Sequence, residues 1–203
     1  MKRIYAGVFA AVGWFAIVGQ FFNAYAGTPN AWNYVSFFTI LSNILVAITL
    51  TSVALAPESA IGRFFQRPAV ATATAVYITV TGIVYYFLLA ALYDLSGWTK
   101  HFDHMLHYVM PPAYVLFWAI FIQKGTLSLR EVPWMLLPPL LYGIYTLLRG
   151  PLVDWYPYPF IDAATLGYPR TFRNIGGFIV FFALVSSIYV LLDHLIARLK
   201  RSL

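Results

Sequence analysis

The chain of 203 residues contains no cysteine. This absence excludes disulfide bonds, thiolate nucleophiles and cysteine-ligated zinc or iron–sulfur sites. Charged residues are also scarce, because they make up 10% of the chain, whereas roughly a quarter of the residues of a soluble domain are charged. With 61% hydrophobic and 19% aromatic residues, the composition excludes an ordinary soluble domain and indicates a protein embedded in a lipid bilayer.

Six long apolar runs make up most of the chain. Each is close to the roughly 20 residues that a transmembrane helix needs, and none alternates in the ten-residue units of barrel strands. The first run exceeds the apolar core of about 7 to 15 residues of a secretory signal, so it is predicted to be a span. We expect an all-α integral membrane protein with six transmembrane helices in a single domain, residues 1–203. The predicted helices cover residues 4–25, 34–56, 68–93, 105–123, 132–148 and 172–196.

Lysine and arginine residues are distributed unequally between the two sides that this topology defines. Cytoplasmic connections carry an excess of both residues, and placing both termini in the cytoplasm puts nine on the inner side and four on the outer side. Both termini are therefore predicted to be cytoplasmic. We attribute the net charge of +6 to this orientation and expect no nucleic-acid partner. The inner residues are Lys2, Arg3, Arg63, Arg67, Lys124, Arg130, Arg198, Lys200 and Arg201; the outer ones are Lys100, Arg149, Arg170 and Arg173.

The connection between the fifth and sixth predicted helices, residues 149–173, is rich in proline and aromatic residues. This composition argues against a flexible linker and predicts a folded outer cap at the membrane interface, where aromatic side chains can lie half in lipid. Arg149 and Arg173 flank the cap, and Asp154 and Asp162 lie within it. We expect ion pairs among these four residues to clamp the cap down, and one arginine could instead hold a carboxylate or phosphate head group.

Polar side chains gather in the outer halves of the predicted helices, where they predict a polar chamber that opens toward the outer leaflet. Ser36, Thr39 and Asn43 are spaced i, i+3 and i+7, which places them on one face of a helix. Two further sets repeat this spacing in other helices: Tyr142, Tyr145 and Arg149, and His104, His107 and Pro111.

Thr39 and His107 lie at similarly shallow depths in different helices, so the topology allows them to meet. Imidazole titrates near neutral pH and can act as a general base toward a hydroxyl nucleophile. Two simpler interpretations stay open. The Thr39 hydroxyl could bond to the carbonyl of Val35 one turn earlier, and a histidine at this depth could simply contact interfacial water.

The histidine-rich segment also raises the question of a metal site. His101, His104 and His107 are spaced i, i+3 and i+6, with Asp94 and Asp103 nearby. On one regular helix this spacing does not converge three imidazoles on a single ion. We therefore predict no metal and no other cofactor, and a metal-dependent membrane hydrolase stays as a third alternative.

Three segments resemble the androgen-induced and androgen-dependent membrane proteins, and most closely their bacterial branch. The segments are FFTILSNIL at residues 37–45, HMLHYVMPP at 104–112 and YPYPF at 156–160, and the similarity extends over nearly the whole chain. The resemblance implies six spans in a bacterial inner membrane and an intramembrane threonine hydrolase, a family whose animal members cleave fatty acid esters of hydroxy fatty acids. It places the nucleophile on Thr39 and the histidine base on His107. The doubled proline at residues 111–112 and the connection before residue 104 depart from the animal proteins.

The expected function is thus hydrolysis of a lipid ester, with the active site near the outer leaflet and membrane lipids around it. The tetrahedral oxyanion needs hydrogen-bond donors, and His107 needs an orienting group. The predicted donors are Asn43, Tyr142, Tyr145 and Asn174, and the predicted orienting groups are Asp103, His104 and Asp162. The alternative is a membrane protein that binds or transports a lipid or small molecule in the same chamber without turnover.

Overall fold

The computed structural model describes residues 1–26 and 28–202, and this part of the chain contains helices and no strand. Five of its helical segments are long and apolar enough to cross a membrane. The fold is therefore all-α and suited to a membrane, as predicted. The five segments are α1 (Lys2–Ala24), α3 (Phe38–Leu55), α5 (Pro68–Val84) with its continuation to Leu92, α8 (Val132–Val153) with the preceding turn η4 (Leu129–Glu131), and α10 (Tyr168–Arg201).

The predicted span 105–123 differs from the other five. It belongs to one continuous helical stretch made of three pieces, and it is not among the five segments above. The pieces are α6 (Gly97–His104), the π-helical turn η3 (Met105–Val109) and α7 (Met110–Phe121). Short elements fill the connections: α2 (Ala31–Tyr34), α4 (Ala60–Phe65), η5 (Pro159–Ile161) and α9 (Ala163–Leu166).

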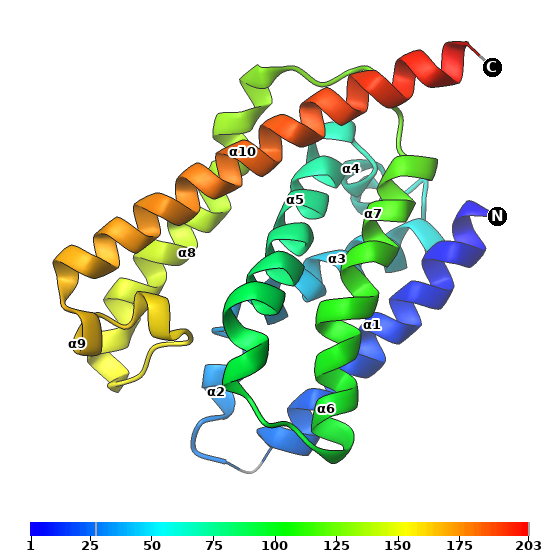
Figure 1. The fold of residues 1–203 in the computed structure, drawn as a ribbon. Coiled ribbons are helices and arrows are strands. Elements are labelled where there is room, and N and C mark those ends of the chain that lie inside the picture. Colours follow the sequence, from blue (N-terminus) through cyan, green and yellow to red (C-terminus); the bar gives the residue numbers. More distant parts are fainter. Residues whose placement is uncertain (27, 203) are drawn as a thin grey trace.

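The long helices form one bundle in which α10 and α8 lie as a pair beside α5, while α1, α3, α5 and α7 pack against one another (Figure 1). Both chain termini lie at one end of the bundle, and α2, α6 and α9 lie at the other end. The interior is filled mainly by large apolar side chains that are fully buried, including Leu50, Ile78, Tyr114, Phe117 and Trp118.

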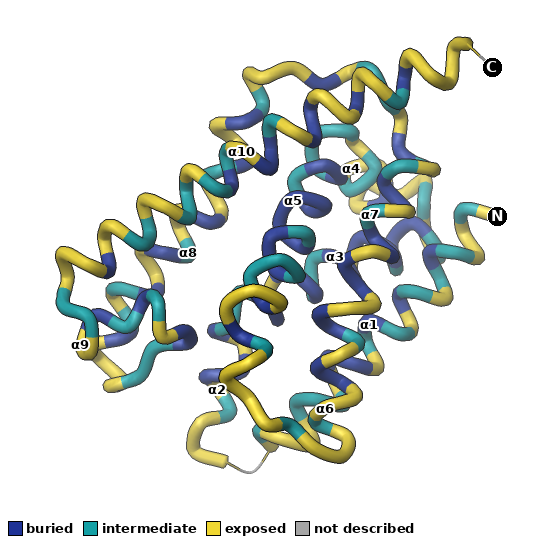
Figure 2. The backbone as a smooth tube through the Cα atoms, in the orientation of Figure 1, coloured by how far each residue is buried: buried dark blue, intermediate teal, exposed yellow. Residues whose placement is uncertain are grey.

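The outer faces of the helices are apolar as well as exposed. Figure 2 shows buried residues on the inward side of each helix and exposed residues along its outward side. On α10 the exposed residues include a row of leucine, isoleucine and valine side chains: Val180, Leu184, Ile188, Leu191 and Leu195. A soluble protein rarely leaves so continuous an apolar surface in water, so these faces are suited to contact with acyl chains.

The helix that carries Thr39 begins later than the sequence predicts. Residues 31–34 form the separate short helix α2, and α3 starts at Phe38 because Phe37 has an extended backbone conformation. The hydroxyl of Tyr34 donates to the carbonyl of Ile17 at 2.6 Å, which holds α2 against α1. Ser36 therefore does not belong to the helix of Thr39, and the predicted polar face over residues 36–43 is wrong at that position.

Residues 154–167, which we call the cap, connect α8 to α10 and fold back toward the bundle. The left-handed conformation of Asp154 ends α8, with φ of 49°. The ring of Tyr156 then packs directly on Gly150, where an added Cβ atom would meet the ring. Asp162 accepts hydrogen bonds from the backbone of Ala164 and Thr165, so its side chain serves as the N-cap of α9.

The predicted ionic clamp of the cap is wrong. Within residues 1–26 and 28–202, neither Arg149 nor Arg173 pairs with an aspartate of the cap. Arg149 donates to Asn33 Oδ1 at 2.6 Å and lies over the Trp155 ring, 5.5 Å from its centroid. For Arg149, the Asn33 amide oxygen and the Trp155 ring thus take the place of the predicted carboxylate partner.

Candidate active site

Thr39 and His107 meet at the end of the bundle that holds α2, α6 and α9. Thr39 Oγ1 lies 3.2 Å from His107 Nε2, and each residue is 8% exposed. The threonine comes from α3 and the histidine from η3, 68 positions apart along the chain. The structure thus brings together the two residues that the sequence predicts as nucleophile and base.

Thr39 occupies the second position of α3, where a backbone N–H group has no acceptor within its own helix. That N–H donates to the hydroxyl of Tyr158 at 3.2 Å, and Thr39 Oγ1 lies 3.4 Å from the same hydroxyl. The bond from Thr39 to the Val35 carbonyl, which was the simpler interpretation, does not form, since the described partners of Oγ1 are His107 and Tyr158. The hydroxyl is therefore available for chemistry.

Asp103 orients the imidazole from the opposite side. Its Oδ1 atom lies 3.1 Å from His107 Nδ1, and its backbone carbonyl lies 2.9 Å from the same nitrogen. Both acceptors favour the tautomer with the proton on Nδ1, which leaves Nε2 free to accept the threonine proton. Thr39, His107 and Asp103 thus stand in the order nucleophile, imidazole and carboxylate, the order that activates a hydroxyl in many hydrolases.

Tyr85 contacts both His107 and Asp103. Its hydroxyl donates to Asp103 Oδ2, and its ring stacks on the imidazole of His107, with centroids 3.7 Å apart and planes inclined by 14°. The sequence alone predicts no role for Tyr85. The signal that could have identified it is weak, because a tyrosine near the end of an apolar helix is common.

Two π-helical turns face each other at this point. Tyr85 opens η1 (Tyr85–Leu89), whose backbone bonds run from Ala90 to Tyr85, and η3 has the same pattern from Met110 to Met105. Pro111 has no N–H group to donate to the carbonyl of His107, so a regular helix cannot be completed there. The doubled proline thus explains the irregular turn that carries the histidine, and such turns occur often at functional sites.

Tyr158 enters the site from the cap. Its side chain is 7% exposed, and burial raises its pKa to about 12. The hydroxyl therefore stays neutral and can donate a hydrogen bond at physiological pH. Its ring stacks on Phe160, with centroids 5.1 Å apart, and meets Phe37 edge-on. The composition of this aromatic segment predicts a position at the membrane interface and does not identify Tyr158 as a site residue.

Asn43 does not act as the predicted oxyanion donor. Its Nδ2 atom donates to the carbonyls of Thr39 at 2.9 Å and Leu106 at 3.2 Å. Both of its donor hydrogens are thereby used. The residue joins α3 to η3 and so helps to set the distance between Thr39 and His107.

The other predicted donors also have different partners. Tyr142 donates to the carbonyl of Ser36 at 2.9 Å, and Tyr145 bonds to the Ser36 hydroxyl at 2.8 Å. Asn174 donates to the carbonyl of Phe160 at 2.9 Å. These three residues of α8 and α10 therefore hold the segments on either side of the site and do not point a free donor at Thr39.

Of the three predicted orienting groups, only Asp103 contacts His107. His104 is exposed and lies edge-on to Tyr108, with centroids 5.3 Å apart. Asp162 is occupied in capping α9. Arg173 is exposed on α10, where no hydrogen bond or ion pair to its side chain occurs within the described residues.

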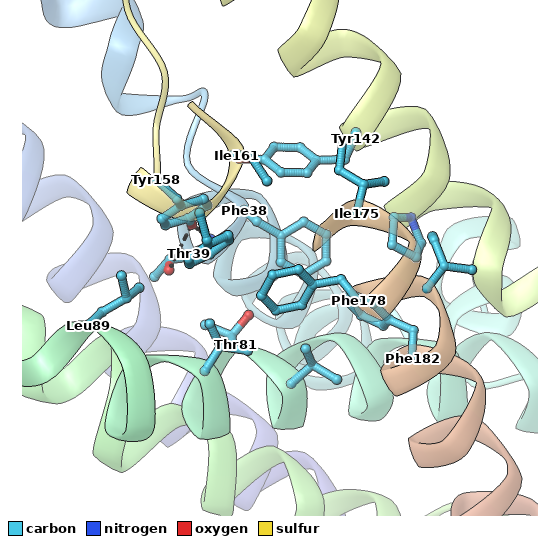
Figure 3. A pocket seen from close by; sticks show the side chains of 16 residues that line it. Phe38, Thr39, Thr81, Leu89, Tyr142, Tyr158, Ile161, Ile175, Phe178 and Phe182 are labelled. Carbon is cyan, nitrogen blue, oxygen red and sulfur yellow. Dashed lines mark hydrogen bonds between the residues drawn. The ribbon is translucent and has the colours of Figure 1, made fainter. Parts of the chain in front are cut away.

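Two cavities meet at Thr39. The first, of about 80 Å³, is lined by apolar side chains of α5, α8, α10 and the cap, as Figure 3 shows. The second, of about 190 Å³, has a more polar lining that includes Gln20, Asp103 and His107. Thr39, Leu89 and Tyr158 line both cavities. A carbonyl group held at Thr39 could therefore extend one substituent into an apolar space and the other into a mixed one.

No group of three or more histidine, aspartate or glutamate side chains in the described ranges could hold a metal ion. In comparisons with known proteins, no family model, curated protein or solved structure matches the chain. The function is therefore inferred from the geometry of the site.

Proposed function

We propose that the chain is a membrane-embedded hydrolase that cleaves lipid esters through an acyl-threonine intermediate. The observation that carries the proposal is the 3.2 Å contact between Thr39 Oγ1 and His107 Nε2, with Asp103 on the other imidazole nitrogen. Isolated buried threonines of membrane helices bond to their own helix. A buried threonine held by an oriented imidazole has the arrangement of an activated nucleophile.

The reaction begins when Thr39 Oγ1 attacks the ester carbonyl and its proton passes to His107 Nε2. The developing imidazolium is stabilised by Asp103, and the oxyanion accepts a hydrogen bond from the Tyr158 hydroxyl, whose oxygen in turn accepts from the Thr39 N–H. The start of α3 adds a favourable partial positive charge. The intermediate collapses as His107 protonates the leaving alkoxide. A water molecule, activated by the same imidazole, then cleaves the acyl-threonine and restores Thr39.

The cavities support a lipid substrate. The first cavity suits an acyl chain because its lining is almost entirely apolar, and the second suits the alcohol part and the attacking water. The resemblance of residues 37–45, 104–112 and 156–160 to the androgen-induced and androgen-dependent proteins supports the same reaction. The animal members of that family cleave fatty acid esters of hydroxy fatty acids, which makes these esters one candidate substrate among lipid esters.

We place the protein in a bacterial inner membrane with six spans. The helical stretch from α6 to α7, the fourth along the chain, is the span added to the five long apolar segments. The excess of lysine and arginine on the side of the termini supports a cytoplasmic position for both ends. The site then lies near the outer leaflet, since Thr39 follows α2 and His107 follows α6 along the chain, and both helices lie at the end of the bundle opposite the termini (Figure 1).

A lipid-binding or transport protein without turnover is the second candidate. The apolar lining of the first cavity favours it, because such a cavity binds an acyl chain without any nucleophile. It predicts that removal of the Thr39 hydroxyl leaves function intact.

The test is hydrolysis of a panel of lipid esters by the purified chain in lipid nanodiscs. Thr39→Ala should lower kcat by roughly a thousandfold or more, whereas Thr49→Ala should stay within about twofold of the parent. Thr49 is the matched control because it is a buried threonine of the same helix and bonds to the carbonyl of Leu45. Wild-type turnover by Thr39→Ala would refute the mechanism, and lipid bound without turnover in the parent would favour the second candidate.

A further inference from the structure

A groove on the outer surface of the bundle runs beside the first cavity. One wall is α5 and η1, with Ile83, Phe87 and Leu88, and the other is α10, with Gly177 and Phe181. Phe87 is 74% exposed and Leu88 is 49% exposed, although both lie in a segment apolar enough to cross a membrane. The groove therefore faces the bilayer.

The groove and the first cavity share three lining residues, Val84, Phe160 and Phe178. These side chains form the boundary between the bilayer-facing surface and the space that leads to Thr39. Asn174 also lines the groove and donates to the carbonyl of Phe160, so one wall of the groove fixes the cap residue at this boundary.

We infer that this groove is the lateral portal through which the acyl chain of a membrane-dissolved ester passes from the bilayer into the first cavity. The inference deepens the proposed function and rests on it. The occupant is an acyl chain because the groove lies between membrane-facing helices and continues at its inner boundary into the apolar cavity beside Thr39. Its lining is mainly apolar, with Arg173 and Asn174 as the polar residues.

A second groove lies between α5 and α7, but it is a poorer route. It shares no lining residue with the first cavity, and His107 is the one residue that it shares with the second cavity. Val115 lines this second groove and no other cavity or groove described above. A bulky residue at Val115 therefore tests the alternative route.

Two adjacent glycines provide a matched pair for the test. An added Cβ atom at Gly176 or Gly177 meets no atom within 4 Å. Gly177 lines the portal and Gly176 does not. Both positions thus have space for the first atom of a side chain, and we expect the ring of Gly177→Trp to enter the groove and that of Gly176→Trp to stay outside it.

The experiment compares a long-chain fluorogenic ester, 4-methylumbelliferyl oleate in phosphatidylcholine nanodiscs, with water-soluble 4-methylumbelliferyl acetate. Gly177→Trp should lower kcat/KM for the oleate ester by about tenfold or more and leave the acetate ester within about twofold. Gly176→Trp and Val115→Trp should change neither by more than about twofold. Equal oleate hydrolysis by Gly177→Trp and the parent, or a loss confined to Val115→Trp, would overturn the portal.

A readout without turnover separates this inference from the proposed function. Nanodiscs that contain a fatty acid with a mid-chain diazirine are irradiated, and the crosslinked residues of the Thr39→Ala protein are identified by peptide mass spectrometry. Crosslinks to first-cavity residues such as Phe182 should fall at least about fivefold with Gly177→Trp and persist with Gly176→Trp. This result supports the portal even if the parent hydrolyses no ester, and unchanged crosslinking refutes the portal even if the parent is an esterase.

Discussion

Tyr85 and His107 stack with nearly parallel rings, 3.7 Å between centroids, while the Tyr85 hydroxyl donates to the carboxylate that orients the same imidazole. One side chain thus restrains both the plane of the base and the position of its acid partner. In the proposed mechanism Tyr85 is a positioning residue, because it has no direct contact with the reacting hydroxyl. Two substitutions can separate the contribution of its ring to kcat from that of its hydroxyl.

Tyr85→Phe should keep the stacking and remove the hydrogen bond to Asp103. We expect kcat to fall about tenfold with KM nearly unchanged, since one hydrogen bond to a charged group is worth about that much. Tyr85→Leu removes both contacts and should lower kcat further. Steady-state kinetics on a short water-soluble ester measure this order, and equal kcat values for the phenylalanine and leucine variants would show that the ring contributes nothing.

Asp103→Asn should lower kcat by about a hundredfold or more, because an amide cannot stabilise the imidazolium and permits the wrong tautomer of His107. The shape of the side chain is preserved, so thermal stability should change little. Asp94→Asn is the control, since Asp94 is exposed and lies outside the site. Equal activity of the two variants in the ester assay would remove Asp103 from the mechanism.

Tyr158→Phe removes the hydroxyl that faces Thr39 and leaves the aromatic packing in place. A reduction of kcat by about a hundredfold is expected from the loss of one oxyanion donor. Tyr156→Phe tests the general effect of a tyrosine change in the cap and should stay within about twofold. A change in KM alone would indicate that Tyr158 contacts substrate without stabilising the oxyanion.

Lys124 lies in the connection after α7 and donates to the Trp118 carbonyl at 2.6 Å. Burial lowers its pKa to about 8, partly opposed by Asp193. Between pH 8 and the ordinary lysine pKa of about 10.4, the unfolded chain binds more protons at this residue than the folded chain. The contribution of Lys124 to stability therefore rises with pH in this window.

Lys124→Met should remove this contribution. The Tm of the parent should rise by about 2–4 °C more than that of Lys124→Met between pH 8 and pH 10, which corresponds to about 1 kcal/mol once partial exposure is considered. Thermal unfolding in one detergent at both pH values gives the comparison. Parallel Tm values for the two proteins would show that Lys124 is not destabilised by burial.

The all-α fold and the positions of the long helices follow from local properties, which is why the sequence predicts them. In lipid, an apolar segment such as α3 or α10 must pair its backbone N–H and C=O groups with one another, and it does so by forming a helix. The ends of the helices are harder to predict from the sequence. The break before Phe38, for example, depends on the extended backbone of Phe37 and on the contact of Tyr34 with α1. That contact joins residues far apart in the chain.

Thr39 and His107 could be selected from depth, residue type and the resemblance, since both are polar groups in apolar segments. Asp103 could also be found, because an acid four residues before a histidine lies on the same helical face. The contact of Tyr158 with Thr39 and the bond from Asn43 to the Leu106 carbonyl could not be predicted from the sequence. The first depends on how the cap folds, which long-range packing determines. The second depends on the π turn of η3, which forms because Pro111 has no N–H group for the His107 carbonyl.

The position of Tyr158 in the last quarter of the chain has a consequence for synthesis. Ribosomes release Thr39 and His107 into the membrane long before residue 158 emerges, so a nascent copy holds a nucleophile and a base without the cap hydroxyl. In the proposed mechanism such a copy is a poor catalyst. By that mechanism, an unfinished or truncated molecule that lacks residue 158 would cleave surrounding lipids far more slowly than the complete chain.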